Sequence, residues 1–303
     1  MTLRHRGHTR LHVGAHGERV EDVAADTAEL AQPLRIATRL EQVEPGFVGE
    51  NLDADIRGNQ RTKAPFERGG REHHGQRHRE ARELFDGHLR NVFVLPNAID
   101  IDRIRENGAY VEAPPCAGPY IVSVARLDEI QKDHRTLLRA YAQLVRTQGG
   151  GGLQEDLVIV GDGGFRHELE ALAMDLGVGK RVHFTGYRNN PHAVVARASA
   201  LVLSSRYEGM PMVLLEALAL GKPVISTDCP TGPREILDDG RFGLLVPIGD
   251  VDAMAGALSR LLSDHALRDG FTREALKRAR AYGVEASNER FVACVTRILE
   301  ERG

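Results

Sequence analysis

The stretch that decides the fold is residues 201–237, LVLSSRYEGMPMVLLEALALGKPVISTDCPTGPREIL. It opens with a short apolar run at 201–203, which predicts a buried strand. A glycine-containing turn follows, and Pro211 stands in a position suited to the first residue of a helix. The apolar residues after it predict a helix over 212–220, and 224–227 is predicted to be the next strand. The stretch therefore predicts a strand–helix–strand unit.

Two glutamates bracket the start of that helix. Glu208 follows the first strand, and Glu216 lies inside the helix among leucines and alanines, where a carboxylate is costly unless a polar group satisfies it. In open α/β sheets, ligands bind beyond the carboxyl ends of strands, and helix N-termini there favour anionic groups. The pair indicates either a site for an anionic or hydroxyl-rich ligand or, as the plainer alternative, a solvated Glu208 and a salt-bridged Glu216.

Strands and helices alternate regularly around this stretch. The remaining strands are predicted at 91–100, 120–125, 157–160, 182–185 and 242–246. The remaining helices are predicted at 133–148, 165–176, 192–198, 251–262, 266–281 and 284–300, with a polar, proline-rich linker over 105–118. Strands separated by helices of this length indicate βαβ units and a parallel sheet. Residues 91–303 are therefore predicted to form an α/β domain with a Rossmann-like, doubly wound parallel sheet.

The first ninety residues have a different composition. They hold eight of the 13 histidines and 14 arginines but a single lysine, and they lack sustained apolar periodicity. Such a segment buries too little apolar surface to offset its ordering entropy, so residues 1–90 are predicted to be poorly structured. His73, His74 and His78 could form a metal cluster, but without matching Cys or carboxylate spacing a solvated polar tract is the favoured interpretation.

Composition limits the class of protein. A chain of 303 residues with 42% hydrophobic residues and a net charge of −3 suits a soluble globular protein and gives no reason to expect a nucleic-acid partner. Cys116, Cys229 and Cys294 lack metal or redox spacing, which favours a reducing compartment. No apolar run approaches ~18 residues and no signal peptide is visible. The sequence thus predicts a cytoplasmic protein and leaves open peripheral contact with the inner face of the plasma membrane.

The motif S-x-x-E-G-x-P-x-x-x-x-E-A-x-A-x-G-x-P-V-I-S-T-D at 205–228 resembles the nucleotide-sugar site of retaining GT-B glycosyltransferases of family 4, the glycosyl transferases group 1. The ending DCPTGPREIL is similar to members that build bacterial polysaccharide or glycolipid repeat units. The resemblance implies the C-terminal half of a GT-B fold. It also implies transfer of a sugar, with retention and without a metal cofactor, from an NDP-sugar, expected to be UDP-linked, to a polysaccharide or glycolipid acceptor.

Residues 1–90 depart from this family. A GT-B enzyme begins with a Rossmann-like acceptor domain, which residues 1–90 do not resemble. The alternative expectation is therefore a truncated, catalytically inactive fragment that still binds a nucleotide sugar.

The resemblance also implies roles for individual residues. The motif R-L-x-x-x-Q-K-D-H at 126–134 matches the family segment in which an Arg and a Lys clamp the diphosphate, which implies this role for Arg126 and Lys132. Such cations stabilise the negative charge of a leaving diphosphate. With these two, Glu208 is the expected catalytic residue, because it orients the donor sugar. The remaining donor contacts are expected from Glu216 on the ribose, Tyr187 and Arg188 near the nucleobase, and Gly209, Met210, Pro211 and Met212 near the sugar and phosphate.

A G-x-G motif at 161–163 invites a dinucleotide interpretation. The third glycine is absent, because Arg166 occupies its position, and no acidic residue follows at the required distance. NAD binding is therefore not favoured. The family resemblance implies instead a structural turn that lines the cleft.

Other patterns carry less weight. The D-x-D triplets at 53–55 and 100–102 resemble the metal-binding motif of the other glycosyltransferase fold, but neither follows a convincing buried strand. His134 is interpreted as a helix-start residue rather than a catalyst. Arg234 and Glu235 are further candidates for lining the donor pocket.

Overall fold

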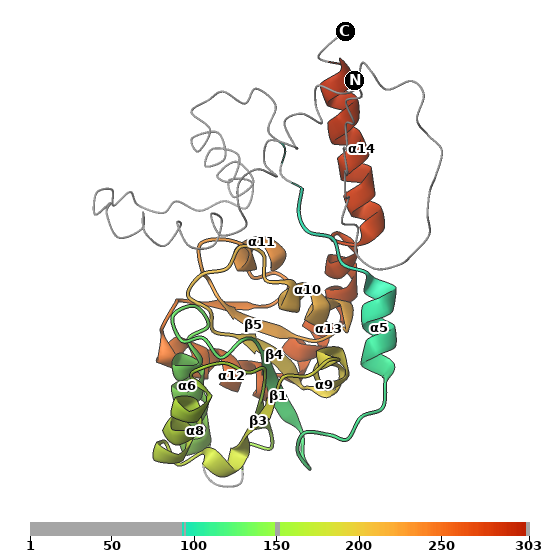
Figure 1. The fold of residues 1–303 in the computed structure, drawn as a ribbon. Helices are drawn as coiled ribbons and strands as arrows, with labels where there is room; N and C mark the ends of the chain where they lie inside the picture. Colours follow the sequence, from blue (N-terminus) through green and yellow to red (C-terminus); the bar gives the residue numbers. More distant parts are fainter. Residues whose placement is uncertain (1–92, 94, 149–151, 301–303) are drawn as a thin grey trace, which may run out of the picture. The chain divides into compact units, whose positions relative to one another are not determined.

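A parallel six-stranded sheet organises the part of the chain that this computed structural model describes, residues 93, 95–148 and 152–300. These residues fall within the unit Arg68–Gly303. The sheet has the order β3-β2-β1-β4-β5-β6 (Figure 1). Its strands are β1 Tyr120–Val124, β2 Asp156–Val160, β3 Val182–Gly186, β4 Ala200–Leu203, β5 Val224–Thr227 and β6 Leu244–Val246. This order is the doubly wound, Rossmann-like arrangement that the alternation of elements predicted.

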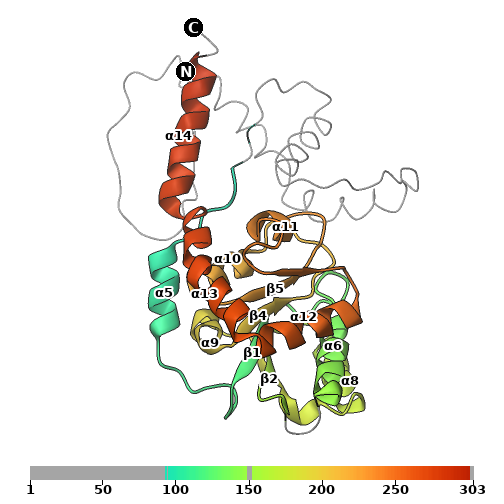
Figure 2. The same ribbon diagram turned by 180° about the vertical axis from the view of Figure 1, so that it is seen from behind.

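Helices cover both faces of the sheet (Figures 1 and 2). One face packs mainly against α6 His134–Thr147, α8 Arg166–Asp175 and α12 Val251–Ser263. The other packs against α5 Ile101–Ala109, α9 Pro191–Arg197, α10 Met212–Ala219 and the later part of α13 His265–Arg280. The remaining helices are α11 Pro233–Ile236, α14 Val284–Glu300 and the 3-10 turn Gly179–Arg181. In the described segments, no helix is both long and apolar enough to cross a membrane.

The apolar strands are explained by this double cover. Successive residues of β1 point to opposite faces, so that Ile121 joins one hydrophobic cluster and Val122 the other, both with no exposed surface. Leu201 and Leu203 join the second cluster, while Val202 between them joins the first. A strand buried on both sides needs a continuous apolar run rather than alternation. Each such side chain contributes about 1.5–3 kcal/mol by leaving water.

The helix of the deciding stretch is close to its prediction. The prediction was 212–220, and α10 spans Met212–Ala219. Pro211, however, is the N-cap residue of α10 and not its first helical residue, with an extended backbone at φ −71° and ψ 95°. Its carbonyl oxygen accepts from the Leu214 N–H at 3.1 Å, which closes the first turn. Gly221, at φ +69°, follows the end of the helix in the left-handed conformation that glycine adopts freely.

The segment before β1 differs from the prediction. Its described residues form no strand over 95–100, because both neighbours of β1 are already strands, β2 and β4. Instead, the buried Ile99 donates its N–H to the Tyr282 carbonyl at 2.8 Å. The linker predicted from residue 105 is also wrong at its start, because α5 continues to Ala109. Asp100 caps that helix, and Ile104 buries its apolar face.

The predictions for residues 1–90, including the histidines at 73–78 and the triplet at 53–55, lie outside the described residues.

Candidate functional site

The strand order reverses between β1 and β4. These two strands are neighbours, with Ile121 opposite Ala200, but the chain continues from β1 to one side of the sheet and from β4 to the other. In α/β sheets, ligands bind at the carboxyl ends of such a pair, in a crevice between the loops that follow the two strands. The loop after β1 carries Arg126 and Lys132, and the loop after β4 carries Glu208. The fold therefore brings the three predicted catalytic residues to its reversal point.

Lys132 and Glu208 meet across this crevice. Lys132 Nζ lies 2.6 Å from Glu208 Oε1, and their side chains are only 15% and 8% exposed. Ser205 Oγ donates to the same carboxylate oxygen at 2.7 Å, and Ser204 Oγ donates to the Lys132 carbonyl at 2.8 Å. The alternative of a solvated Glu208 is therefore wrong. The ion pair is fixed by the fold and largely shielded from water.

Arg126 reaches this pair through a glutamine. Its guanidinium is exposed, and Nη2 lies 3.5 Å from Gln131 Oε1. Gln131 Nε2 in turn donates to the Tyr207 carbonyl at 3.3 Å, next to Glu208. Gln131 thus links the β1 loop to the β4 loop. The sequence motif contained this residue, but its bridging role depends on a partner 76 positions away.

Two glycines hold the β1 loop in place. A Cβ atom at Gly161, where φ is +140°, would overlap the Ala125 carbonyl, and one at Gly163 would overlap the Leu127 carbonyl. Leu127 N–H donates to the Asp162 carbonyl at 3.0 Å. The G-x-G motif is therefore a site of close backbone approach beside Arg126.

The loop before α10 is packed from two sides. A Cβ at Gly232 would overlap the ring of Pro211, and the Thr231 hydroxyl donates to the Glu208 carbonyl. The N–H of Asn97 donates to the Met210 sulfur at 3.2 Å. No side chain caps α10 at Pro211. The partial positive charge of this helix N-terminus, between Gly209 and Met212, therefore lies beside the crevice.

Glu216 has the polar partner that its apolar surroundings demanded. Its Oε2 lies 3.4 Å from His192 Nε2, and the other ring nitrogen of His192 lies 3.4 Å from Asn107 Nδ2. Asn190 Nδ2 donates to the Asn107 carbonyl at 2.9 Å. These contacts join α5, α9 and α10. His192 and Asn107 had no role assigned from the sequence.

Tyr187 and Arg188 line a separate pocket of about 570 Å³ at the carboxyl end of edge strand β3. Tyr187 is 76% exposed, and Arg188 Nη1 lies 3.9 Å from Glu112 Oε2. Asn190, which also lines this pocket, leads into α9 and so to the network around Glu216. The pocket and Glu216 are thus joined by the first turn of one short helix.

His134 begins α6, as predicted, and is fully buried. The carboxylate of Glu129 accepts from the N–H groups of His134 at 3.0 Å and Arg135 at 3.1 Å. Burial alone would raise the pKa of Glu129, but hydrogen bonds from these two residues outweigh it and lower that pKa. Glu129 is therefore an anionic cap on α6 that braces the loop carrying Lys132.

The β5 loop lies next to Glu208, because the Thr231 hydroxyl donates to the Glu208 carbonyl. Arg234 donates to both carboxylate oxygens of Asp228 and, at 3.2 Å, to Asp239. Cys229, which follows Asp228, is buried. This burial, together with the negative charge of Glu208, raises the pKa of Cys229 to about 12. Arg234 is thus engaged within its own loop.

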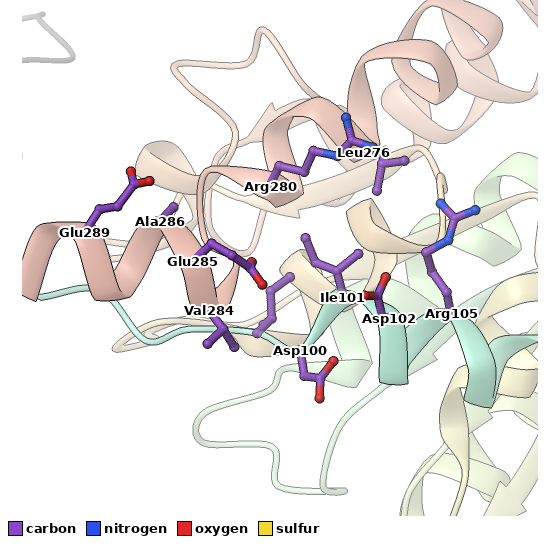
Figure 3. Close-up of a pocket in the computed structure, with 11 residues that line it drawn as sticks. Asp100, Ile101, Asp102, Arg105, Leu276, Arg280, Val284, Glu285, Ala286 and Glu289 are labelled. Atoms are coloured by element: carbon purple, nitrogen blue, oxygen red, sulfur yellow. The ribbon is translucent and has the colours of Figure 1, made fainter.

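A pocket of about 620 Å³ lies between α5 and the junction of α13 with α14 (Figure 3). Its lining includes Asp100, Asp102, Arg105, Arg280 and Glu285, so both charge signs face it. The Asp100 carboxylate accepts from a backbone N–H in the first turn of α5. The second D-x-D triplet thus has a helix-capping role.

The fold and these contacts together define a Rossmann-like domain with a candidate ligand site at the carboxyl ends of its strands. Residues 118–264, which include all six strands, match the family described as Glycosyl transferases group 1. Over this segment, just under half of its length, the chain is similar to that family.

Individual glycosyltransferases are similar to the chain as well. A 4-alpha-N-acetylgalactosaminyltransferase of Campylobacter jejuni, named for a diphospho-undecaprenol substrate, is 35% identical over 189 residues, 62% of this chain and 49% of that protein. The lipopolysaccharide core biosynthesis glycosyltransferase LpsE of Rhizobium meliloti is 34% identical over 182 residues, 60% of this chain and 51% of that protein. The chain thus spans about half the length of these curated relatives.

Solved structures show the same fold. The lipopolysaccharide outer core galactosyltransferase WaaB is 26% identical with a TM-score of 0.57, over 71% of this chain and 58% of that one. A glycosyltransferase from Rickettsia africae, 15% identical, has a TM-score of 0.63 over 75% of this chain and 62% of that one. The structural neighbours are GT-B enzymes, as the sequence motif predicted.

Proposed function

We propose that this chain binds a UDP-linked sugar in the crevice between the β1 and β4 loops and transfers the sugar, with retention, to a polysaccharide or glycolipid acceptor. The observation that carries the proposal is the shielded contact between Lys132 and Glu208 at the reversal of strand order. The similarity of residues 118–264 to a glycosyltransferase family supports it. So do relatives named for transfer to lipid-linked and lipopolysaccharide glycans.

The diphosphate would bind to Lys132, to the exposed guanidinium of Arg126 and to the uncapped start of α10. Negative charge develops on the diphosphate as the glycosidic bond breaks, and preorganised cations stabilise this charge most effectively where water is scarce. The low exposure of Lys132 supports this role. These groups supply the stabilisation that a divalent cation would otherwise give, so we propose a metal-independent reaction.

Glu208 would orient the donor sugar. Its carboxylate accepts from both Lys132 and Ser205 at the same oxygen, Oε1, which fixes its orientation through two loops. A carboxylate fixed in this way can accept hydrogen bonds from sugar hydroxyls next to the diphosphate. The diphosphate oxygen would assist removal of the proton from the acceptor hydroxyl on the same face of the sugar, which gives retention.

The nucleoside would lie further along the same edge. Glu216 is 27% exposed and keeps a carboxylate near α9, where it can accept from ribose hydroxyls. The loop of Tyr187 and Arg188 would contact the nucleobase through its backbone. Its pocket connects to Glu216 through Asn190, which supports placing base and ribose at these two points.

The other partners are proposed on the same basis. Residues 91–303 would form the nucleotide-sugar-binding unit, and the acceptor would be a glycan or a lipid-linked glycan, without nucleic acid. A lipid-linked acceptor would place the protein peripherally at the inner face of the plasma membrane.

Calorimetry with UDP tests the donor site. The full chain should bind UDP, and Lys132→Ala should weaken binding while Lys180→Ala, an exposed lysine at the opposite edge of the sheet, should not. Incubation with UDP-sugars and lipid-linked glycan, followed by mass analysis, tests transfer. Equal UDP affinity in the wild type and in Lys132→Ala would refute the assigned crevice. UDP binding without sugar transfer would overturn the proposed reaction but keep the donor site.

A further inference from the structure

The amino-terminal ends of the strands, opposite the donor crevice, hold a cluster of three potential metal ligands. Asp156 is the first residue of β2, His183 is the second residue of β3, and Cys116 lies in the bend before β1. One ligand atom from each side chain lies within 4.8 Å of the other two. All three residues are partly buried, and they come from segments 40 and 27 positions apart, which is why no sequence spacing revealed them.

The geometry is close to that of a three-ligand metal site. His183 Nε2 lies 2.8 Å from Asp156 Oδ2. Zinc binds sulfur at about 2.3 Å and nitrogen or oxygen at about 2.0–2.2 Å, so ligand atoms around one ion are separated by roughly 3–4 Å. The three atoms therefore need only small side-chain movements to surround an ion. A water molecule would complete a tetrahedral set as the fourth ligand.

The surroundings suit such an ion. The other Asp156 oxygen, Oδ1, accepts from Arg181 Nε at 3.0 Å, so the carboxylate is oriented while Oδ2 remains directed at His183. Arg181 Nη2 is itself held by the carbonyls of Leu153 and Glu155 at 3.0 and 3.1 Å. A carboxylate whose second oxygen is hydrogen-bonded is the usual arrangement around protein-bound metals. Thiolate, imidazole and carboxylate together favour zinc over magnesium or calcium.

We propose that Cys116, Asp156 and His183 bind a zinc ion that fastens the segment before β1 to the amino ends of β2 and β3. This site is separate from the donor crevice, because it lies at the opposite ends of the same strands. Its role would be structural. Zinc should stabilise the folded chain without being needed for UDP binding.

Cobalt substitution in the full-length, reduced and metal-stripped chain tests the site. One equivalent of Co²⁺ should produce a thiolate-to-cobalt charge-transfer band in the near ultraviolet. The histidines of residues 1–90 cannot produce this band, because that segment has no cysteine. Cys116→Ser should abolish the band, whereas Cys294→Ser should keep it. A band that is absent from the wild type, or that survives Cys116→Ser, would overturn the proposal.

Two further variants separate ligation from folding. Losing a residue that only supports a metal ligand weakens metal binding roughly 10- to 100-fold. Because His183 is proposed to be a ligand itself, His183→Ala should weaken Co²⁺ binding by at least this factor. His167→Ala is the matched control, since that histidine is 97% exposed, and it should not change the affinity. Free zinc at roughly 100 times its Kd should raise the Tm of the wild type by about 5–10 °C. The same zinc should leave the Tm of Cys116→Ser unchanged, and an equal rise in both proteins would count against the site.

Discussion

The parallel sheet has charged side chains at both ends of its strands, here called the amino edge and the carboxyl edge. At one edge they lie in the strands, and at the other they lie in the loops. At the amino edge, Asp156 and His183 lie in the strands themselves, and Arg181 closes the group through hydrogen bonds to a carboxylate and two carbonyls. At the carboxyl edge, Lys132 and Glu208 lie in loops, and they meet because β1 and β4 are neighbours.

The difference shows how position in the sheet decides what a charge can do. At the carboxyl edge the strand order reverses between β1 and β4, which is where ligands bind in α/β sheets, and the cations of the β1 loop lie there. The amino ends of β2 and β3 have no such reversal, and their polar atoms are close enough to satisfy one another. The carboxyl edge therefore offers cations at the place where ligands bind in such sheets, whereas at the amino edge the charged groups pair with one another.

The largest effect at the carboxyl edge is expected from Lys132→Ala. Removing a charge-assisted bond to the diphosphate should cost about 1.5–3 kcal/mol of UDP binding, or roughly 10- to 150-fold in Kd. Arg126→Ala should act in the same direction. Calorimetry gives the affinity and circular dichroism checks the fold. Unchanged UDP affinity in both variants would remove the diphosphate role from this loop.

Glu129→Gln should weaken the hydrogen bonds that hold the β1 loop to the start of α6. Its carboxylate accepts two backbone N–H groups, so the substitution should lower the free energy of unfolding by about 1–2 kcal/mol at neutral pH. Because folding lowers the pKa of Glu129 from 4.5, this stabilisation is complete above pH 4.5 and is lost as the pH falls through the folded pKa. Urea melts should therefore show a larger difference between wild type and variant at pH 7 than at pH 3.

Asp156→Asn probes the amino edge. Its ion pairs with Arg181 and His183 are 22–30% exposed, so solvent screens them and the variant should lose about 0.5–1 kcal/mol of stability in metal-free buffer. UDP affinity should stay at the wild-type value. A fall in UDP affinity comparable to that of Lys132→Ala would mean that the two edges are coupled.

The smallest effect is expected from a chelator. Excess EDTA should leave UDP-sugar binding unchanged, since the proposed reaction relies on protein cations in place of a metal at the carboxyl edge. The same treatment should lower the Tm if zinc occupies the amino edge. Loss of UDP-sugar binding in EDTA would instead give a metal a direct part in donor recognition.

Much of the fold could be predicted from local pattern. The apolar runs of β4 and β5 and the helix between them were predicted to within one residue, because strands buried on both sides must be apolar and α10 is apolar almost throughout. The prediction of a strand and a linker was wrong over 95–109, because local pattern does not show which segments pair in the sheet. The strand-like residues of this segment pair with nothing in the sheet, and Ile99 bonds instead to Tyr282, far along the chain.

For the candidate site, the sequence and the tertiary structure likewise determine different things. The sequence by itself determined which residues were candidates, because Arg126, Lys132, Glu208 and Glu216 stand in motifs with fixed spacing. Only the tertiary structure decided their partners: Lys132 for Glu208, His192 for Glu216, and Cys116 beside Asp156 and His183. Motif spacing reflects contacts within one loop or helix. Pairs between elements depend on strand order and register, which arise when the whole sheet assembles.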